Sequence, residues 1–138
     1  MLSSVTDEVV EAFGRLLPQL SRSAPALEAR AIEAISSSPA ITILLARCDT
    51  KIAGMLTLAM FPIPTGLRAW IEDVVVDEAF RGRGTGEELT KAALRLAAAA
   101  GARTVDLTSR PSRAAAGRLY ERAGFQQRDS RLYRYSFE

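Results

Sequence analysis

The chain contains no histidine and a single cysteine, Cys48, among its 138 residues. Without histidine, the sequence excludes Ser-His-Asp and Cys-His catalysis, histidine-ligated zinc and a histidine general base. One cysteine excludes an internal disulfide, a Cys-x-x-Cys redox pair and a zinc finger. Any acid–base chemistry therefore falls to glutamate, aspartate, tyrosine, lysine or a water molecule, and we expect no metal cofactor.

Long apolar runs are also missing, although 48% of the residues are hydrophobic. No stretch reaches the roughly 18 apolar residues of a membrane span. The N-terminal MLSSVTDEVVEAF lacks the basic start and unbroken apolar run of a secretory signal. The net charge of +2 is too small to indicate nucleic-acid binding. Together with the lone cysteine, these features predict a cytoplasmic protein whose partners are neither nucleic acid nor membrane.

The hydrophobic pattern divides the chain into helical and strand-like segments without an internal repeat or a linker. Pro18 is expected to end the first helix. Helices are expected at residues 8–17, 26–38, 86–102 and 112–124. Strands are expected at residues 40–47, 52–61, 68–76, 103–109, 125–127 and 131–137. This order predicts one domain over residues 1–138, an α/β (α+β) fold with a mixed sheet and helices packed against it.

The segment RGRGTG, from Arg81 to Gly86, lies between the third strand and the longest helix. Its three glycines allow successive N–H groups to converge on one anion, and the following helix start adds partial positive charge. Arg81 and Arg83 add cationic donors. The segment therefore predicts a site for a diphosphate-bearing ligand, with a simple glycine-rich turn as the alternative. Its spacing fits neither a Walker P-loop nor a Rossmann fingerprint.

Two segments resemble the signatures of the GNAT N-acetyltransferase superfamily. The family pattern [RQ]-x-x-G-x-[GA] is met within VVVDEAFRGRGTGEEL by Arg81, Gly84 and Gly86. The family pattern A-x-x-L-Y-x-x-x-G-F is matched within AAAGRLYERAGF by Leu119, Tyr120, Gly124 and Phe125. Both motifs are in the family's order, separated by a helix and a strand. The resemblance implies a mostly antiparallel central sheet flanked by about four helices, splayed between the motif strand and the next one.

The resemblance also implies acetyl-CoA as the donor, bound by the glycine-rich loop and the strand before it. The pantetheine arm would lie beside Val74, Val75 and Val76. The diphosphate would lie on the loop formed by Arg81, Gly82, Arg83, Gly84, Thr85 and Gly86. Many relatives carry an asparagine shortly before the tyrosine. At those positions this chain has Ser112, which can supply one hydrogen bond to the cofactor, and Gly117, which supplies none.

Acetyl transfer to an amine needs a base, a stabilised oxyanion and a proton for the departing thiolate. Glu72 and Asp73 point to opposite faces of one strand, so only one of them can face the site. We favour Glu72 as the base, acting directly or through a water molecule, because polyamine-type relatives place an acidic pair at this spacing. The resemblance implies Tyr120 as the general acid and the N–H of Val74 as the oxyanion donor.

The expected acceptor is a primary amine, of a small molecule, an amino acid or a peptide or protein. Candidate substrate contacts are Phe61, Trp70, Asp73 and Tyr133. The transferred group can be acetyl or another short acyl group. A non-catalytic acyl-CoA-binding regulatory domain is the alternative function. Segment 131–137 suggests a homodimer formed by pairing across two copies.

Overall fold

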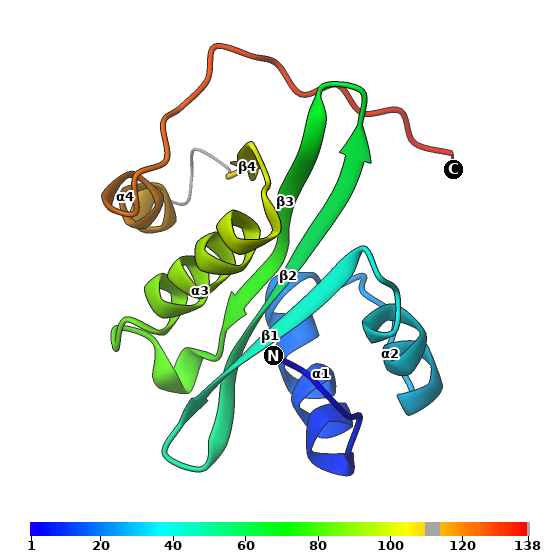
Figure 1. The fold of residues 1–138 in the computed structure, drawn as a ribbon. Coiled ribbons are helices and arrows are strands. Elements are labelled where there is room, and N and C mark those ends of the chain that lie inside the picture. Colours follow the sequence, from blue (N-terminus) through cyan, green and yellow to red (C-terminus); the bar gives the residue numbers. More distant parts are fainter. Residues whose placement is uncertain (110–113, 138) are drawn as a thin grey trace.

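The computed structural model describes residues 1–109 and 114–137, and its centre is a four-stranded mixed sheet in the order β1-β2-β3-β4 (Figure 1). The first three strands pair antiparallel, and β4 pairs parallel with β3. The strands are β1 (Ile41–Cys48), β2 (Lys51–Ile63), β3 (Gly66–Val76) and β4 (Thr104–Asp106). The helices are α1 (Asp7–Leu20), α2 (Ala29–Ser36), the 3₁₀ turn η1 (Glu78–Phe80), α3 (Thr85–Ala100) and α4 (Ala114–Arg122). The predicted fold class is confirmed.

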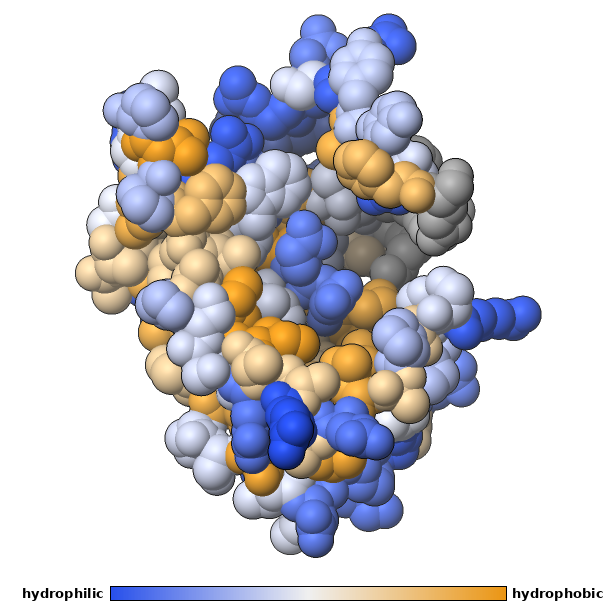
Figure 2. All heavy atoms as spheres, turned by 90° about the vertical axis from the view of Figure 1, so that its right-hand side faces the viewer, coloured by the Kyte–Doolittle hydropathy of each residue, from blue (hydrophilic) through white to orange (hydrophobic). Residues whose placement is uncertain are grey.

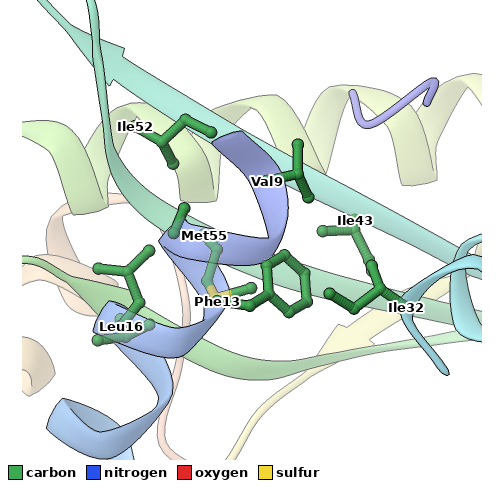
Figure 3. Close-up of a cluster of buried hydrophobic side chains, with 9 residues drawn as sticks. Val9, Phe13, Leu16, Ile32, Ile43, Ile52 and Met55 are labelled. Carbon is green, nitrogen blue, oxygen red and sulfur yellow. The ribbon is translucent and has the colours of Figure 1, made fainter. Parts of the chain in front are cut away.

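The sheet separates two hydrophobic cores, because alternate residues of its strands face opposite sides. Helices α1 and α2 cover one face, and α3 covers the other with α4 beside it (Figure 1). The α1 and α2 core is shown in Figure 3, where Phe13 lies between the two helices and the sheet. Its buried members include Val9, Phe13, Leu16, Ile32, Ile43, Ile52, Met55 and Val75. The α3 core is built by Leu44, Leu56, Leu58, Ala69, Ile71, Leu89, Ala93 and Ala97.

A bulge interrupts the pairing of β2 with β3 in the middle of the sheet. Thr57 pairs with Glu72 and Met55 pairs with Val75, so two residues of β3 stand opposite one residue of β2. The first of these two, Asp73, has a φ of 49°, in the left-handed region that aspartate tolerates better than most residues. The extra residue bends β3 and reverses which face its later side chains take.

The pairing of β3 with β4 is short. β4 contacts only the stretch from Arg68 to Trp70. Beyond Trp70, β3 has no ladder partner on that side among the described residues, so Ile71–Val76 forms an open edge. This opening is the splay that the resemblance implied.

The first helix continues past Pro18 to Leu20, so the expectation that Pro18 ends it is wrong. Proline removes one backbone hydrogen bond from a helix interior, and other contacts compensate here. Gln19 donates a side-chain hydrogen bond to the Arg15 carbonyl oxygen at 3.2 Å, and its side-chain oxygen accepts one from the Glu78 N–H at 2.9 Å. These bonds hold the last turn of α1 against the end of β3.

The two closing strands expected at residues 125–127 and 131–137 do not form in the structure. Segment 125–137 crosses the far end of the β2–β3 hairpin instead, without joining the sheet (Figure 1). Its large apolar side chains are mostly exposed, including Leu132, Tyr133, Tyr135 and Phe137. The homodimer through this segment stays a prediction.

Two further expectations concern membranes and metals. None of the described helices is both long enough and apolar enough to cross a bilayer. Within residues 1–109 and 114–137, no group of three or more cysteine and acidic side chains is arranged to hold a metal ion.

Asp77 ties the end of β3 to α1. Its largely buried carboxylate accepts a hydrogen bond from the Ala79 N–H at 3.1 Å and contacts the side chains of Gln19 and Arg15. The Arg15 guanidinium also donates to the Ile52 carbonyl oxygen at 3.0 Å. The hydrogen bond from Ala79, followed by those from Gln19 and Arg15, holds the pKa of Asp77 below its ordinary value.

Replacing Asp77 with asparagine should lower the free energy of unfolding at pH 7 by about 1–3 kcal/mol, because hydrogen bonds to a charged group are lost. Since the folded-state pKa is lowered, the contribution of Asp77 is present above the unfolded-state pKa of about 4 and is lost as the pH falls through the folded-state value. Urea unfolding from pH 7 to pH 2 should therefore show a steeper acid loss in the wild type than in Asp77→Asn. Asp49→Asn, in the exposed β1–β2 turn, is the control. Parallel acid profiles for the wild type and Asp77→Asn would contradict this account.

Candidate functional site

The glycine-rich loop joins η1 to α3 at the end of the open β3 edge. Gly82 and Gly84 have φ values of 83° and 78°, which other residues adopt only with strain. These conformations turn the chain so that Gly84 becomes the N-cap of α3. No hydrogen bond is recorded from the backbone N–H groups of residues 82–87, all of which lie in the described part of the chain. The loop therefore presents a run of free donors at a helix N-terminus, where anions bind.

The space next to the first two glycines of the loop is open, whereas the space next to the third is filled by protein. A Cβ atom added to Gly82 or Gly84 would meet no heavy atom within 4 Å. One added to Gly86 would lie 3.3 Å from Leu119 of α4 and 3.7 Å from Val76. Gly82 and Gly84 thus leave room for a ligand, and Gly86 lets α3 approach α4 and β3 closely.

Three side chains of the loop contact other parts of the protein. Arg81 donates from Nε to the Val76 carbonyl oxygen at 3.2 Å, and the Arg83 guanidinium lies 5.3 Å from the ring centre of Phe80. Thr85 is buried, with its hydroxyl 3.5 Å from the Cys48 thiol. The backbone is consequently the main donor of this loop, and Thr85 can contribute through its N–H alone.

The open edge of β3 supplies further backbone groups next to the loop. Val74 and Val76 are half-buried and follow the bulge, while Val75 is buried in the α1 and α2 core. The side chain of Val75 therefore packs the sheet and cannot contact a ligand at the edge. An unpaired strand edge can hydrogen-bond an extended molecule that carries amides, as a further strand would.

Tyr120 lies on α4, which packs beside the first turn of α3. Its ring contacts Phe125 edge-on, with the centroids 5.8 Å apart, and the side chain is half-buried. Arg122 pairs with Glu87 at 3.7 Å, which ties the end of α4 to the beginning of α3. These contacts position Tyr120 relative to the loop. Ser112 lies outside the described residues, and nothing in the structure explains the glycine at position 117.

A pocket of about 360 Å³ lies beyond the open edge, on the face of the sheet that α1 and α2 cover. It is walled by β2 and β3, by the chain just after β4, and by the C-terminal segment. Figure 2 looks at this side of the molecule and shows polar and apolar residues mixed around its hollowed centre. The lining residues are Ala59, Phe61, Trp70, Glu72, Thr108, Leu132 and Arg134.

Three residues expected at the site, Phe61, Trp70 and Glu72, meet in this pocket. Asp73 and Tyr133 do not line it. Asp73 occupies the bulge, and Tyr133 is 85% exposed. The roles of all these residues stay predictions, since their positions alone do not test them.

The sequence reasoning missed Thr108, Leu132 and Arg134 as pocket residues. The alternation of Leu132, Tyr133 and Arg134 held a usable signal, because residues two apart in an extended segment share one side. Tyr133 was chosen for its aromatic ring, whereas its two neighbours face the pocket. Thr108 carries no such signal, since only the topology brings it beside Glu72.

Comparisons with known proteins agree with this arrangement. The family model described as Acetyltransferase (GNAT) family matches residues 5–125. A search of curated proteins finds no match to the chain.

Solved structures match the chain along nearly its whole length. A protein of Agrobacterium tumefaciens assigned provisionally as an acetyltransferase is 27% identical, with a TM-score of 0.86 and coverage of 99% of both chains. A protein of Bacillus halodurans described as a transcriptional regulator is 26% identical, with a TM-score of 0.81 and coverage of 97% of both chains. An aminoglycoside N-acetyltransferase in complex with CoA is 18% identical, with a TM-score of 0.77, and the match covers 93% of this chain and 88% of the other. That last likeness concerns the fold. From the family match over residues 5–125, we conclude that this chain belongs to the GNAT family of acetyltransferases.

Proposed function

We propose that this GNAT acetyltransferase moves the acetyl group of acetyl-CoA to a primary amine by direct attack. The observation that carries the proposal is the run of unbonded N–H groups at residues 82–87, placed at the end of the open β3 edge. A CoA molecule needs donors for its diphosphate and partners for its two amides, and these two features supply them side by side. The CoA complex of an aminoglycoside N-acetyltransferase with the same fold supports this choice of cofactor.

The residues present fit the cofactor. Acetyl-CoA supplies an activated acetyl group as a thioester. The N–H groups of Arg83, Gly84, Thr85 and Gly86 would hold the diphosphate, and the α3 N-terminus would add partial positive charge. The edge of Val74 and Val76 would hold the pantetheine amides. The Val74 N–H would also stabilise the developing negative charge on the carbonyl oxygen.

Two side chains would move protons. Glu72 lines the pocket beside the open edge, where its carboxylate would accept a proton from the attacking amine, directly or through water. Tyr120, which follows the Leu119 that lies against Gly86 of the loop, would donate a proton to the departing sulfur. Glu72 precedes the bulge and Val74 lies in it, so the proposed base and the proposed oxyanion donor would come from adjacent parts of one strand.

Acetyl-CoA should raise the melting temperature of the wild type, because it binds only the folded state. Gly84→Asp should abolish that shift at equal ligand concentration, since a carboxylate would project into the open space and repel the diphosphate. Gly84→Asn is the matched control, with the same shape, a similar tolerance of positive φ and no charge. Both substitutions place a side chain at the positive φ of position 84, so the strain is similar in the two variants and Gly84→Asn sets the reference stability. An undiminished acetyl-CoA shift in Gly84→Asp would contradict diphosphate binding at this loop.

Tyr120→Phe should lower kcat by about 10²–10⁴-fold, the usual range for losing an acid–base group. The ring contact with Phe125 is retained, so acetyl-CoA should still raise the melting temperature as in the wild type. Tyr135→Phe, at an exposed position, should leave kcat unchanged. Stopped-flow or steady-state release of free thiol measures the effect. Equal kcat values for Tyr120→Phe and the wild type would remove the hydroxyl from the mechanism.

Glu72→Gln should lower kcat/KM at pH 7 by about 10²-fold or more, and the deficit should shrink as the pH rises. The reason is that the acceptor amine loses its own proton at high pH and needs the base less. Asp73→Asn tests the alternative carboxylate and should change kcat/KM little, because Asp73 lies in the bulge and outside the pocket lining. The reverse pattern in the two pH profiles would make Asp73 the base.

A further inference from the structure

The pocket beside the open edge carries two charges of opposite sign. Glu72 comes from β3, and Arg134 comes from the C-terminal segment. Among the hydrogen bonds and ion pairs of the described residues, none involves either side chain. The protein therefore leaves one carboxylate and one guanidinium unneutralised on the lining of the same small pocket.

The rest of the lining is uncharged. Phe61, Trp70, Ala59 and Leu132 provide apolar surface, and Thr108 provides one hydroxyl. The guanidinium of Arg68 lies 5.6 Å from the Trp70 ring centre, and it is neutralised by an ion pair with Asp106 at 2.8 Å. The Arg68–Asp106 ion pair packs against Trp70 and adds no net charge next to it.

This distribution selects among amines by their second charged group. A polycation would gain one favourable contact at Glu72 and would be repelled by Arg134. An amine without an anionic group would leave the Arg134 guanidinium without a partner. An amine that also carries an anion would satisfy both groups, and guanidinium recognises carboxylate and phosphate in a bidentate manner.

We propose that the acceptor is a small amine that carries an anionic group, a carboxylate or a phosphate, with its amine at Glu72 and its anion at Arg134. The pocket of about 360 Å³ is in the size range of small-molecule sites. This inference rests on the proposed acetyl transfer and names its substrate class. It also gives Arg134 a role in specificity, as a residue that contacts the acceptor.

The test compares amines that differ in the anionic group, with free thiol release from acetyl-CoA as the readout. Phenylalanine is compared with phenethylamine for the carboxylate, and phosphoethanolamine with ethanolamine for the phosphate. Spermidine represents the polycations. In at least one pair, the amine that carries the anionic group should exceed the amine that lacks it in kcat/KM by about tenfold or more, the usual gain from a charge-assisted hydrogen bond. The pair with the larger ratio identifies the anion.

Arg134→Gln should reduce that ratio to within about twofold of unity, because the pocket then has no cation to distinguish an amine with an anionic group from one without it. Arg134→Lys should restore part of the ratio, because the positive charge returns without the bidentate geometry. Arg131→Gln is the matched control, since Arg131 lies in the same segment and does not line the pocket. It should leave the ratio as in the wild type.

Three outcomes overturn this inference alone. They are a wild-type preference for spermidine or for the amines that lack an anionic group, no turnover of any amine that carries one, and an unchanged ratio in Arg134→Gln. In each, acetyl-CoA would still raise the melting temperature of the wild type. If acetyl-CoA gives no melting shift and no amine releases thiol, the proposed function itself fails, and this inference fails with it.

Discussion

The bulge at Asp73 and Val74 is the constraint on which both halves of the site depend. Before it, Trp70 and Glu72 face the side of the sheet covered by α1 and α2. After it, Val75 faces that same side and is buried there, although strict alternation would turn it the other way. One extra residue thus lets β3 present an acidic side chain to the pocket and still anchor its end in the core. The positive φ of Asp73 is the local cost of this arrangement.

The three loop glycines act through different physical requirements. Gly82 and Gly84 are needed for their positive φ angles, and the space that a side chain there would take is empty. Gly86 is needed because α4 lies against it. The exposure of the loop N–H groups therefore depends on the packing of α3 against α4. That packing extends to α4 through Leu119, so the helix that carries Tyr120 and the loop at the start of α3 are positioned together. A shift of α4 would move both Tyr120 and the start of α3.

The sequence predicted what depends on local pattern and missed what depends on distant contacts. Helix α3, the β1–β2 hairpin and the loop follow from periodicity and glycine spacing, and the structure has them. Pro18 lies inside α1 because Gln19 finds partners on η1, some 60 residues later in the chain, which no local pattern shows. The alternation of segment 131–137 is strand-like, but a strand also needs a neighbour, and this segment pairs with none of the four strands. The resemblance predicts Glu72, Phe61 and Trp70 as site residues, and the structure brings them together because they share one face of two paired strands. Arg134 could not be predicted in this way, because its place depends on where the C-terminal segment crosses the hairpin.

The two sides of the proposed site differ in composition, because one is made of backbone groups and the other of side chains. The proposed cofactor side consists of backbone groups on β3 and at the start of α3, which are fixed by the sheet, by helix geometry and by the contacts of Asp77. The proposed acceptor side depends on Leu132 and Arg134, which come from a segment that lies across the hairpin without pairing with it. If both proposals hold, substitutions in that segment would alter which amine is accepted without touching the groups proposed to bind acetyl-CoA. The choice of acceptor would then be physically separable from acetyl transfer, because backbone hydrogen bonds fix the proposed cofactor side and a few side-chain contacts fix the proposed acceptor side.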